Sequence, residues 1–86
     1  MTLQEWIKKE GISNAEAARR LDVSSFNPST NIGRWVSIDP KSFRIPHEDN
    51  MLKIMRGTNN EVQPNDFYEH IWKINKKVYA SFYTLD

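Results

Sequence analysis

Residues 13–35, SNAEAARRLDVSSFNPSTNIGRW, contain the pattern that decides the predicted fold. An alanine-rich segment ends near Leu21, a short polar turn follows, and a second segment ends at Trp35. Two short helices joined by a turn, with small polar residues and an arginine on the second, form the sequence outline of a helix-turn-helix. The second helix of such a motif fits the major groove of DNA, where its side chains can contact base edges.

Two capping boxes predict where the first two helices begin. Thr2 stands three residues before Glu5, and Ser13 stands three residues before Glu16. In each pair the hydroxyl can accept from the later backbone amide while the carboxylate reaches back to the earlier one. Gly11 suits the left-handed end of the first helix.

Helix start and stop signals continue along the chain. Asn27, followed by a proline, predicts the start of a third helix, and residues 37–44 form a loop with Asp39-Pro40 as its turn. Residues 45–56 predict a fourth helix that Gly57 ends, and a fifth begins near Pro64. The expected inward-facing residues are Leu3, Trp6, Ile7, Ala17, Ala18, Leu21, Val23, Ile32, Trp35 and Val36, and the apolar positions of the fourth helix are Met51, Leu52, Ile54 and Met55.

The last segment allows two interpretations. Apolar residues from Phe67 to Leu85 recur every three or four positions, which is typical of one helical stripe. The final VYASFYTL is rich in strand-forming residues. We favour a helix to about Lys77 and leave residues 78–86 open between helix and strand.

Composition narrows the class of protein. The chain has 86 residues, enough for one modest core, and no cysteine, which excludes disulfides and thiolate metal sites. Twelve Lys and Arg against eleven Asp and Glu give a net charge of +1, which permits DNA binding without demanding it. No apolar run is long enough to span a membrane, and no basic leader precedes the first helix, so we expect a cytoplasmic protein.

The pattern A-A-R-R-L-x-V-S…I-x-R-W, together with the later IPHEDNMLKIMRGTNNEVQPNDFY, resembles the phage repressor and Cro class (XRE-like) of helix-turn-helix transcriptional regulators. The resemblance covers residues 3–68. It implies an all-α, five-helix DNA-binding domain over residues 1–68, in the cytoplasm of a bacterial or phage-infected cell. Residues 69–86 match no part of this pattern and form an extension.

Two features depart from the family pattern. Asp22 occupies the turn position usually held by glycine, where a positive φ is needed. About four extra residues, 25–28, lie between Val23 and Ile32. Either the corner bulges outward or the third helix starts late, at Asn27. Phe26 in this insertion is a core residue, a DNA wedge or a partner contact, and burial is favoured.

Candidate DNA contacts follow from side-chain chemistry. Asn and Arg can form paired hydrogen bonds with adenine and guanine, and Ser or Thr can bond either way. The base-contact candidates are Ser29, Thr30, Asn31, Gly33 and Arg34. The resemblance implies a phosphate contact at Asn14, and the loop after the third helix adds Lys41, Ser42 and Arg44. For Lys41 and Arg44, an ordinary solvent-exposed position without a ligand is an equal alternative to a phosphate contact.

The extension carries more aromatic surface than the domain needs. We expect it to pair two copies through Trp72, Val78, Tyr79, Phe82 and Tyr83, with packing onto its own domain as the alternative. His47 and His70 lack a second histidine at helical spacing, so no metal site is expected. No cofactor, membrane or small-molecule effector is expected.

The predicted function is a sequence-specific transcriptional regulator that binds a double-stranded operator as a homodimer, and represses by occluding a promoter. The alternative is a helix-turn-helix fold that binds a host or partner protein, which the near-neutral charge and the insertion favour slightly. The sequence contains no constellation of catalytic residues, so an enzyme is not expected.

Overall fold

The computed structural model describes residues 1–23 and 27–83, and it describes side chains as far as residue 75. Within these residues the chain forms helices and no strand. The helices are α1 (Leu3–Glu10), α2 (Asn14–Arg20), α3 (Pro28–Val36), α4 (Glu48–Gly57) and α5 (Pro64–Tyr83). The predicted all-α class with five helices is therefore confirmed.

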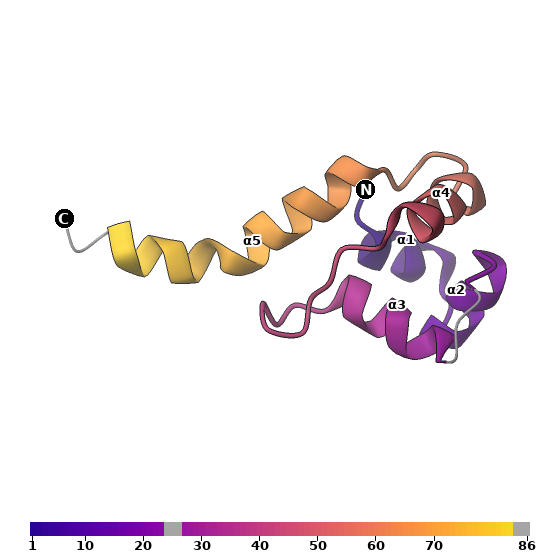
Figure 1. Ribbon diagram of the computed structural model, residues 1–86, viewed down its shortest axis with the longest axis horizontal. Coiled ribbons are helices and arrows are strands. Elements are labelled where there is room, and N and C mark those ends of the chain that lie inside the picture. The colour runs from indigo at the N-terminus through magenta and orange to yellow at the C-terminus, as the bar shows by residue number, and fades with distance from the viewer. Residues whose placement is uncertain (24–26, 84–86) are drawn as a thin grey trace.

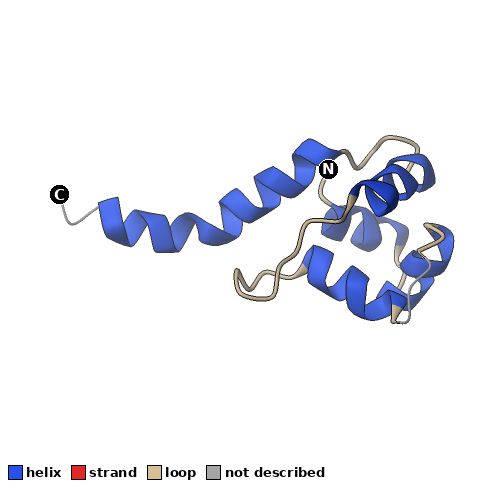
Figure 2. Ribbon diagram, viewed as in Figure 1, coloured by secondary structure: helices blue, strands red, loops and turns tan. Residues whose placement is uncertain are grey.

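Helices α1 to α4 gather into one body, and α5 starts beside α1 and projects away from it (Figures 1 and 2). The described chain measures 46 × 25 × 25 Å. A helix of 20 residues is about 30 Å long, so α5 accounts for the long dimension. The side chains of Lys9 and Glu61, 2.7 Å apart, join α1 to the turn before α5.

The predicted capping box of α1 is present. The amide of Thr2 donates to the Glu5 carboxylate at 2.8 Å, and the amide of Glu5 donates to the Thr2 hydroxyl at 3.2 Å. At α2 only half of the expected box forms: Ser13 Oγ accepts from the Glu16 amide at 3.1 Å. The Glu16 carboxylate turns to the arginines of the next turn instead, because opposite charges three and four residues apart share a helical face.

The core agrees with the predicted inner faces at most positions. The buried apolar residues are Leu3, Trp6, Ile7, Ala17, Ala18, Leu21, Val23, Ile32, Trp35, Phe43, Ile54, Val62 and Phe67. Of the apolar residues predicted for α4, Ile54 is fully buried, whereas Leu52 is 45% exposed. Phe43 comes from the loop after α3, where no periodicity indicates burial.

At the end of α2, Asp22 and Val23 agree with what the sequence predicts for them. Asp22 takes the left-handed conformation, with φ of 57°, and Val23 is buried directly after it. Ala17 and Ala18 are buried too, and their small side chains let α3 approach α2 closely. Helix α3 begins at Pro28, which is the late start of the two alternatives. Phe26 and the rest of residues 24–26 lie outside the described residues.

Some predicted boundaries need correction. Asn27 precedes α3, but its side chain makes no capping hydrogen bond. Helix α4 begins at Glu48 rather than 45, and it ends at Gly57 as predicted. A Cβ on Gly57 would lie 2.4 Å from Leu21 Cδ2, so this glycine allows α4 to pack closely against the end of α2.

Helix α5 corrects the interpretation of the tail. It continues past Lys77 to Tyr83, so the strand alternative is wrong for residues 78–83. The division between residues 68 and 69 stays a prediction, but it falls inside α5. His70 is buried beyond it, and Ile71 and Ile74 pack against the core. Among the described helices, none is both long enough and apolar enough to cross a membrane.

Candidate nucleic-acid interface

Helix α3 has one buried and one polar face. Ile32 and Trp35 are buried, with 0% and 5% of their surface exposed. On the other side Ser29, Thr30 and Arg34 are exposed. Three of the five predicted base-contact residues therefore reach solvent, and the remaining two, Asn31 and Gly33, are half-buried.

Gly33 leaves open space on this helix. A Cβ placed on it would meet no atom within 4 Å, in contrast to the crowded Gly57. Its φ is not in the left-handed region, so neither packing nor backbone geometry requires glycine at this position. A helix without a side chain here can come nearer to an external surface such as a DNA groove.

Arg34 and Arg44 line the same hollow between α3 and the start of α4. The hollow has a volume of about 240 Å³. Its lining residues are Asn31, Arg34, Trp35, Arg44, Ile45, His47 and Asn50. The two arginines are also joined through the backbone, because the Arg44 amide donates to the Arg34 carbonyl at 3.1 Å. The structure thus brings together one predicted base contact and one predicted phosphate contact.

Hydrogen bonds hold the Arg44 guanidinium in place. It donates to the carbonyl of Lys41 at 3.0 Å and to that of Phe43 at 2.7 Å. A guanidinium carries five N–H donors in a rigid fork, so further donors stay available for an anion. His47 and Asn50 share this hollow but were not among the predicted contacts. Their positions at the start of α4 could have indicated a contact with this hollow only if the path of the preceding loop had been known.

The loop between α3 and Arg44 is organised by Asp39. Its carboxylate accepts from the Lys41 amide at 3.0 Å and from the Ser42 hydroxyl at 3.3 Å, and its carbonyl accepts from the amides of Ser42 and Phe43. The Lys41 side chain is exposed and can reach a phosphate. The Ser42 hydroxyl is engaged within the loop, which makes it the weaker of these two candidates.

Asn14 is the first residue of α2 and is exposed. Its neighbour Ser13 already caps the helix through the Glu16 amide. The Asn14 side chain is therefore not needed for capping, and its contact with a phosphate stays a prediction.

His70 has a role that the sequence did not indicate. It is 5% exposed and its Nε2 lies 2.7 Å from the Ser37 carbonyl oxygen. Its ring stacks on Phe43, with centroids 4.6 Å apart and planes 11° apart. Both partners lie in the loop after α3, and only the folded chain brings them to α5. No local sequence pattern around His70 would have revealed this contact.

The predicted pairing surface on α5 is described in part. Trp72 is 63% exposed, and its contact with a second copy stays a prediction. Val78, Tyr79, Phe82 and Tyr83 belong to the helix, but their side chains lie outside the described part of the chain. Ile38, in the loop after α3, is 71% exposed.

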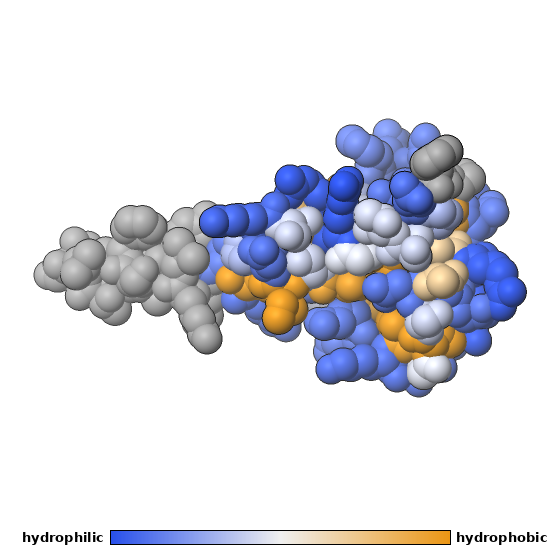
Figure 3. Space-filling view, turned by 90° about the horizontal axis from the view of Figure 1, so that it is seen from below, coloured by the Kyte–Doolittle hydropathy of each residue, from blue (hydrophilic) through white to orange (hydrophobic). Residues whose placement is uncertain are grey.

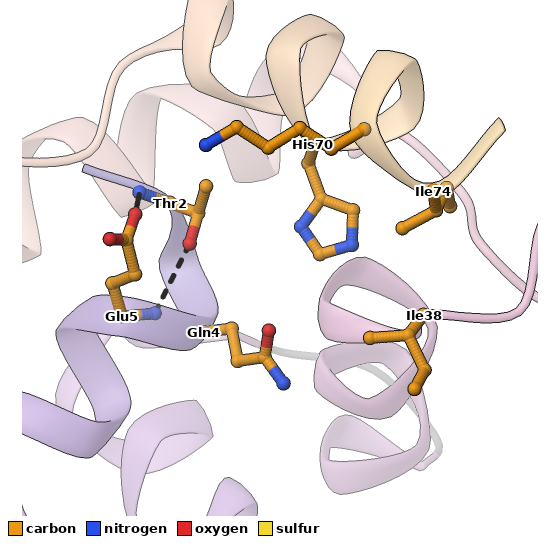
Figure 4. Close-up of a pocket in the computed structure, with 7 residues that line it drawn as sticks. Thr2, Gln4, Glu5, Ile38, His70 and Ile74 are labelled. Atoms are coloured by element: carbon orange, nitrogen blue, oxygen red, sulfur yellow. Dashed lines mark hydrogen bonds between the residues drawn. The ribbon is translucent and has the colours of Figure 1, made fainter. Parts of the chain in front are cut away.

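A second hollow lies at the root of α5, between that helix and the start of α1. It has a volume of about 260 Å³, and its lining residues are Thr2, Gln4, Glu5, Ile38, His70, Lys73 and Ile74 (Figure 4). In the space-filling view from below, apolar areas interrupt a largely hydrophilic surface (Figure 3). Apolar side chains are thus exposed on a face that also carries polar groups.

Comparison with known proteins gives no relative from which to infer a role: no family model, no curated protein and no solved structure matches this chain.

Proposed function

We propose that this chain is a sequence-specific DNA-binding transcriptional regulator of the repressor and Cro type, which inserts α3 into the major groove of an operator half-site. The observation that supports the proposal most is the outer face of α3. Ser29, Thr30 and Arg34 are exposed there, opposite the buried Ile32 and Trp35. Small polar side chains flanking an arginine can hydrogen-bond base edges without blocking the approach of the helix.

The hollow beside α3 supports a phosphate contact next to the base contacts. Arg44 is held by two backbone carbonyls, so its charge is placed in advance of binding. Lys41 is exposed on the same loop. A helix in the groove with these two cations beside it agrees with the usual division between base contacts that specify and phosphate contacts that position.

Binding as a homodimer would place two α3 helices on a two-fold operator. Half-sites are then about 34–36 Å apart, one turn of DNA. We propose that α5, which projects from the body and carries the exposed Trp72, pairs the two copies. Occupation of a promoter by such a dimer excludes polymerase, and this mechanism needs no effector.

The decisive experiment selects bound duplexes from a random library and then measures fluorescence anisotropy on the selected sequence at two salt concentrations. The expected result is a palindrome bound tightly and with strong salt dependence, since log K falls by about 0.9 per displaced phosphate contact for each tenfold rise in salt. An Arg34→Ala variant serves as the matched control for specificity. Absence of any enriched motif would overturn the proposal.

A second candidate is a protein-interaction module with the same fold. Two observations favour it: the net charge is only +1, and the apolar side chains of Ile38 and Trp72 are exposed. Weak, sequence-independent DNA binding with little salt dependence is the outcome that would favour this second function over the first.

A further inference from the structure

His70 joins α5 to both ends of the loop that follows α3. Ser37, whose carbonyl oxygen lies 2.7 Å from His70 Nε2, directly follows the last residue of α3. Phe43, on which the His70 ring stacks, directly precedes Arg44. A carbonyl can only accept, so Nε2 carries the proton in this contact. Figure 4 shows His70 extending from α5 toward the hollow that Ile38 and Ile74 also line.

The Ser37 carbonyl needs a partner because it lies beyond the end of α3, where no intrahelical amide is available. Phe43 is 3% exposed, so its ring is packed between the body and His70. The segment from Ser37 to Phe43 is therefore fastened to α5 at its first and last residues. Inside the segment, the Asp39 carboxylate accepts hydrogen bonds from the Lys41 amide and the Ser42 hydroxyl.

We propose that His70 is a positioning residue: by holding residues 37–43 against α5, it sets where Lys41 and Arg44 stand beside α3. This inference rests on the proposed DNA-binding function for its consequence, but the tether itself is independent of any ligand. Because α5 is also the element proposed to pair two copies, His70 links the position of the pairing helix to the loop that grips DNA.

Amide hydrogen exchange tests the tether without DNA. His70→Phe keeps an aromatic ring against Phe43 and removes the donor to Ser37, whereas His70→Gln keeps an amide donor and removes the ring. In both variants, exchange should become about tenfold faster at the Phe43 and Arg44 amides, which is the factor expected when one hydrogen bond is lost. Exchange in α1 and α2 should stay unchanged. Those amides donate to the Asp39 and Arg34 carbonyls.

Glu69→Gln, at an exposed neighbouring position on α5, is the matched control and should change neither set of amides. Equal acceleration across the whole chain, or none in the loop, would show that His70 only contributes to stability and would overturn the proposal. If both His70 variants fail to fold, Phe43→Leu removes the stacking partner and leaves His70 intact. It should accelerate exchange at the amides of residues 43 and 44 and leave those of α1 and α2 unchanged.

Salt dependence on the selected duplex tests the consequence for DNA. In His70→Phe, loss of one or two positioned cations should make the negative slope of log K against log salt shallower, by about 0.9 to 1.8. Lys41→Ala provides the reference for loss of one contact. A weaker affinity with an unchanged slope contradicts a positioning role. If the wild-type chain binds no DNA, the proposed function fails, and the exchange result still decides whether His70 tethers the loop.

Discussion

At the scale of single residues, Arg34 and Arg44 line the same hollow but have different environments. Both side chains are exposed, but the Arg44 guanidinium is anchored by the carbonyls of Lys41 and Phe43, and Arg34 lies on the outer face of α3. An anchored guanidinium suits a phosphate, which occurs at every position of DNA. An exposed guanidinium on the central face of the helix suits guanine, which the Arg fork can contact through two acceptors.

Arg34→Ala should therefore weaken binding to the selected operator by about 1–3 kcal/mol and relax the base preference at one position. Arg56→Ala, an exposed arginine at the far end of α4, is the control and should have a much smaller effect. Anisotropy titrations on the selected duplex and on single-base variants measure both quantities. Unchanged affinity and preference would remove Arg34 from the recognition surface.

The glycines of α3 and α4 give a second prediction at this scale. A Cβ on Gly57 would meet the buried Leu21 at 2.4 Å, so Gly57→Ala should lower the free energy of unfolding by about 1–3 kcal/mol. Gly33→Ala meets open space and should raise it by about 0.5–1 kcal/mol, because alanine favours the helix. Urea unfolding of both variants is the measurement. Equal effects of the two changes would contradict this packing argument.

At the scale of elements, the start of α1 makes stability depend on pH. Hydrogen bonding to Thr2 lowers the pKa of the Glu5 carboxyl below its ordinary value. The backbone amide of Thr2 has the larger effect and its hydroxyl the smaller one. A lowered folded pKa means that the stabilisation is present above the pKa of the unfolded chain. It is lost as the pH falls through the folded pKa.

Glu5→Gln should consequently be less stable than the wild-type chain at neutral pH, and the difference should shrink on acidification from about pH 7 to about pH 3. Thermal unfolding followed by circular dichroism measures it. Glu61→Gln is an informative comparison because it removes a carboxylate that pairs with Lys9 on α1 instead of capping the helix. A stability difference between the two chains that grows toward acid pH would contradict a lowered pKa of Glu5 in the folded state.

Elements were predictable where the controlling interactions are local. The Thr2 box, the Ser13 cap, the Pro28 start and the left-handed Asp22 all depend on neighbours within a few residues. Predictions failed where a distant contact decided the outcome. The fourth helix ends at Gly57 as expected, but the close contact that this glycine allows with Leu21 was not predicted, because only folding brings Leu21 near.

At the scale of the whole molecule, α5 has two parts. Phe67 and His70 are buried, Ile71 and Ile74 pack against the core, and the later part of the helix projects beyond the body (Figure 1). A projecting helix of this length gains little from its own hydrogen bonds, since short isolated helices are marginal in water. Packing against a second copy would stabilise it.

Sedimentation of the full chain should accordingly show a dimer at micromolar concentration, and Trp72→Glu should shift it toward monomer with little loss of monomer stability. Leu52→Glu, which adds the same charge at a half-exposed position on α4, should leave the dimer intact. The monomeric variant should also bind a palindromic duplex more weakly than the wild-type chain does. A Trp72→Glu chain that stays dimeric would place the pairing surface elsewhere.

By itself the sequence determined the helical class, the number of helices, most cap positions and most of the core, because periodicity and capping depend on residues close in the chain. It also placed Ser29, Thr30 and Arg34 on the exposed side of α3, although Asn31 and Gly33, predicted with them, are half-buried. Only the tertiary structure decided that Arg34 and Arg44 line one hollow, that Phe43 is buried, and that His70 holds the loop after α3. These contacts join segments far apart in sequence, and the path of the chain between them is set by packing of the whole core.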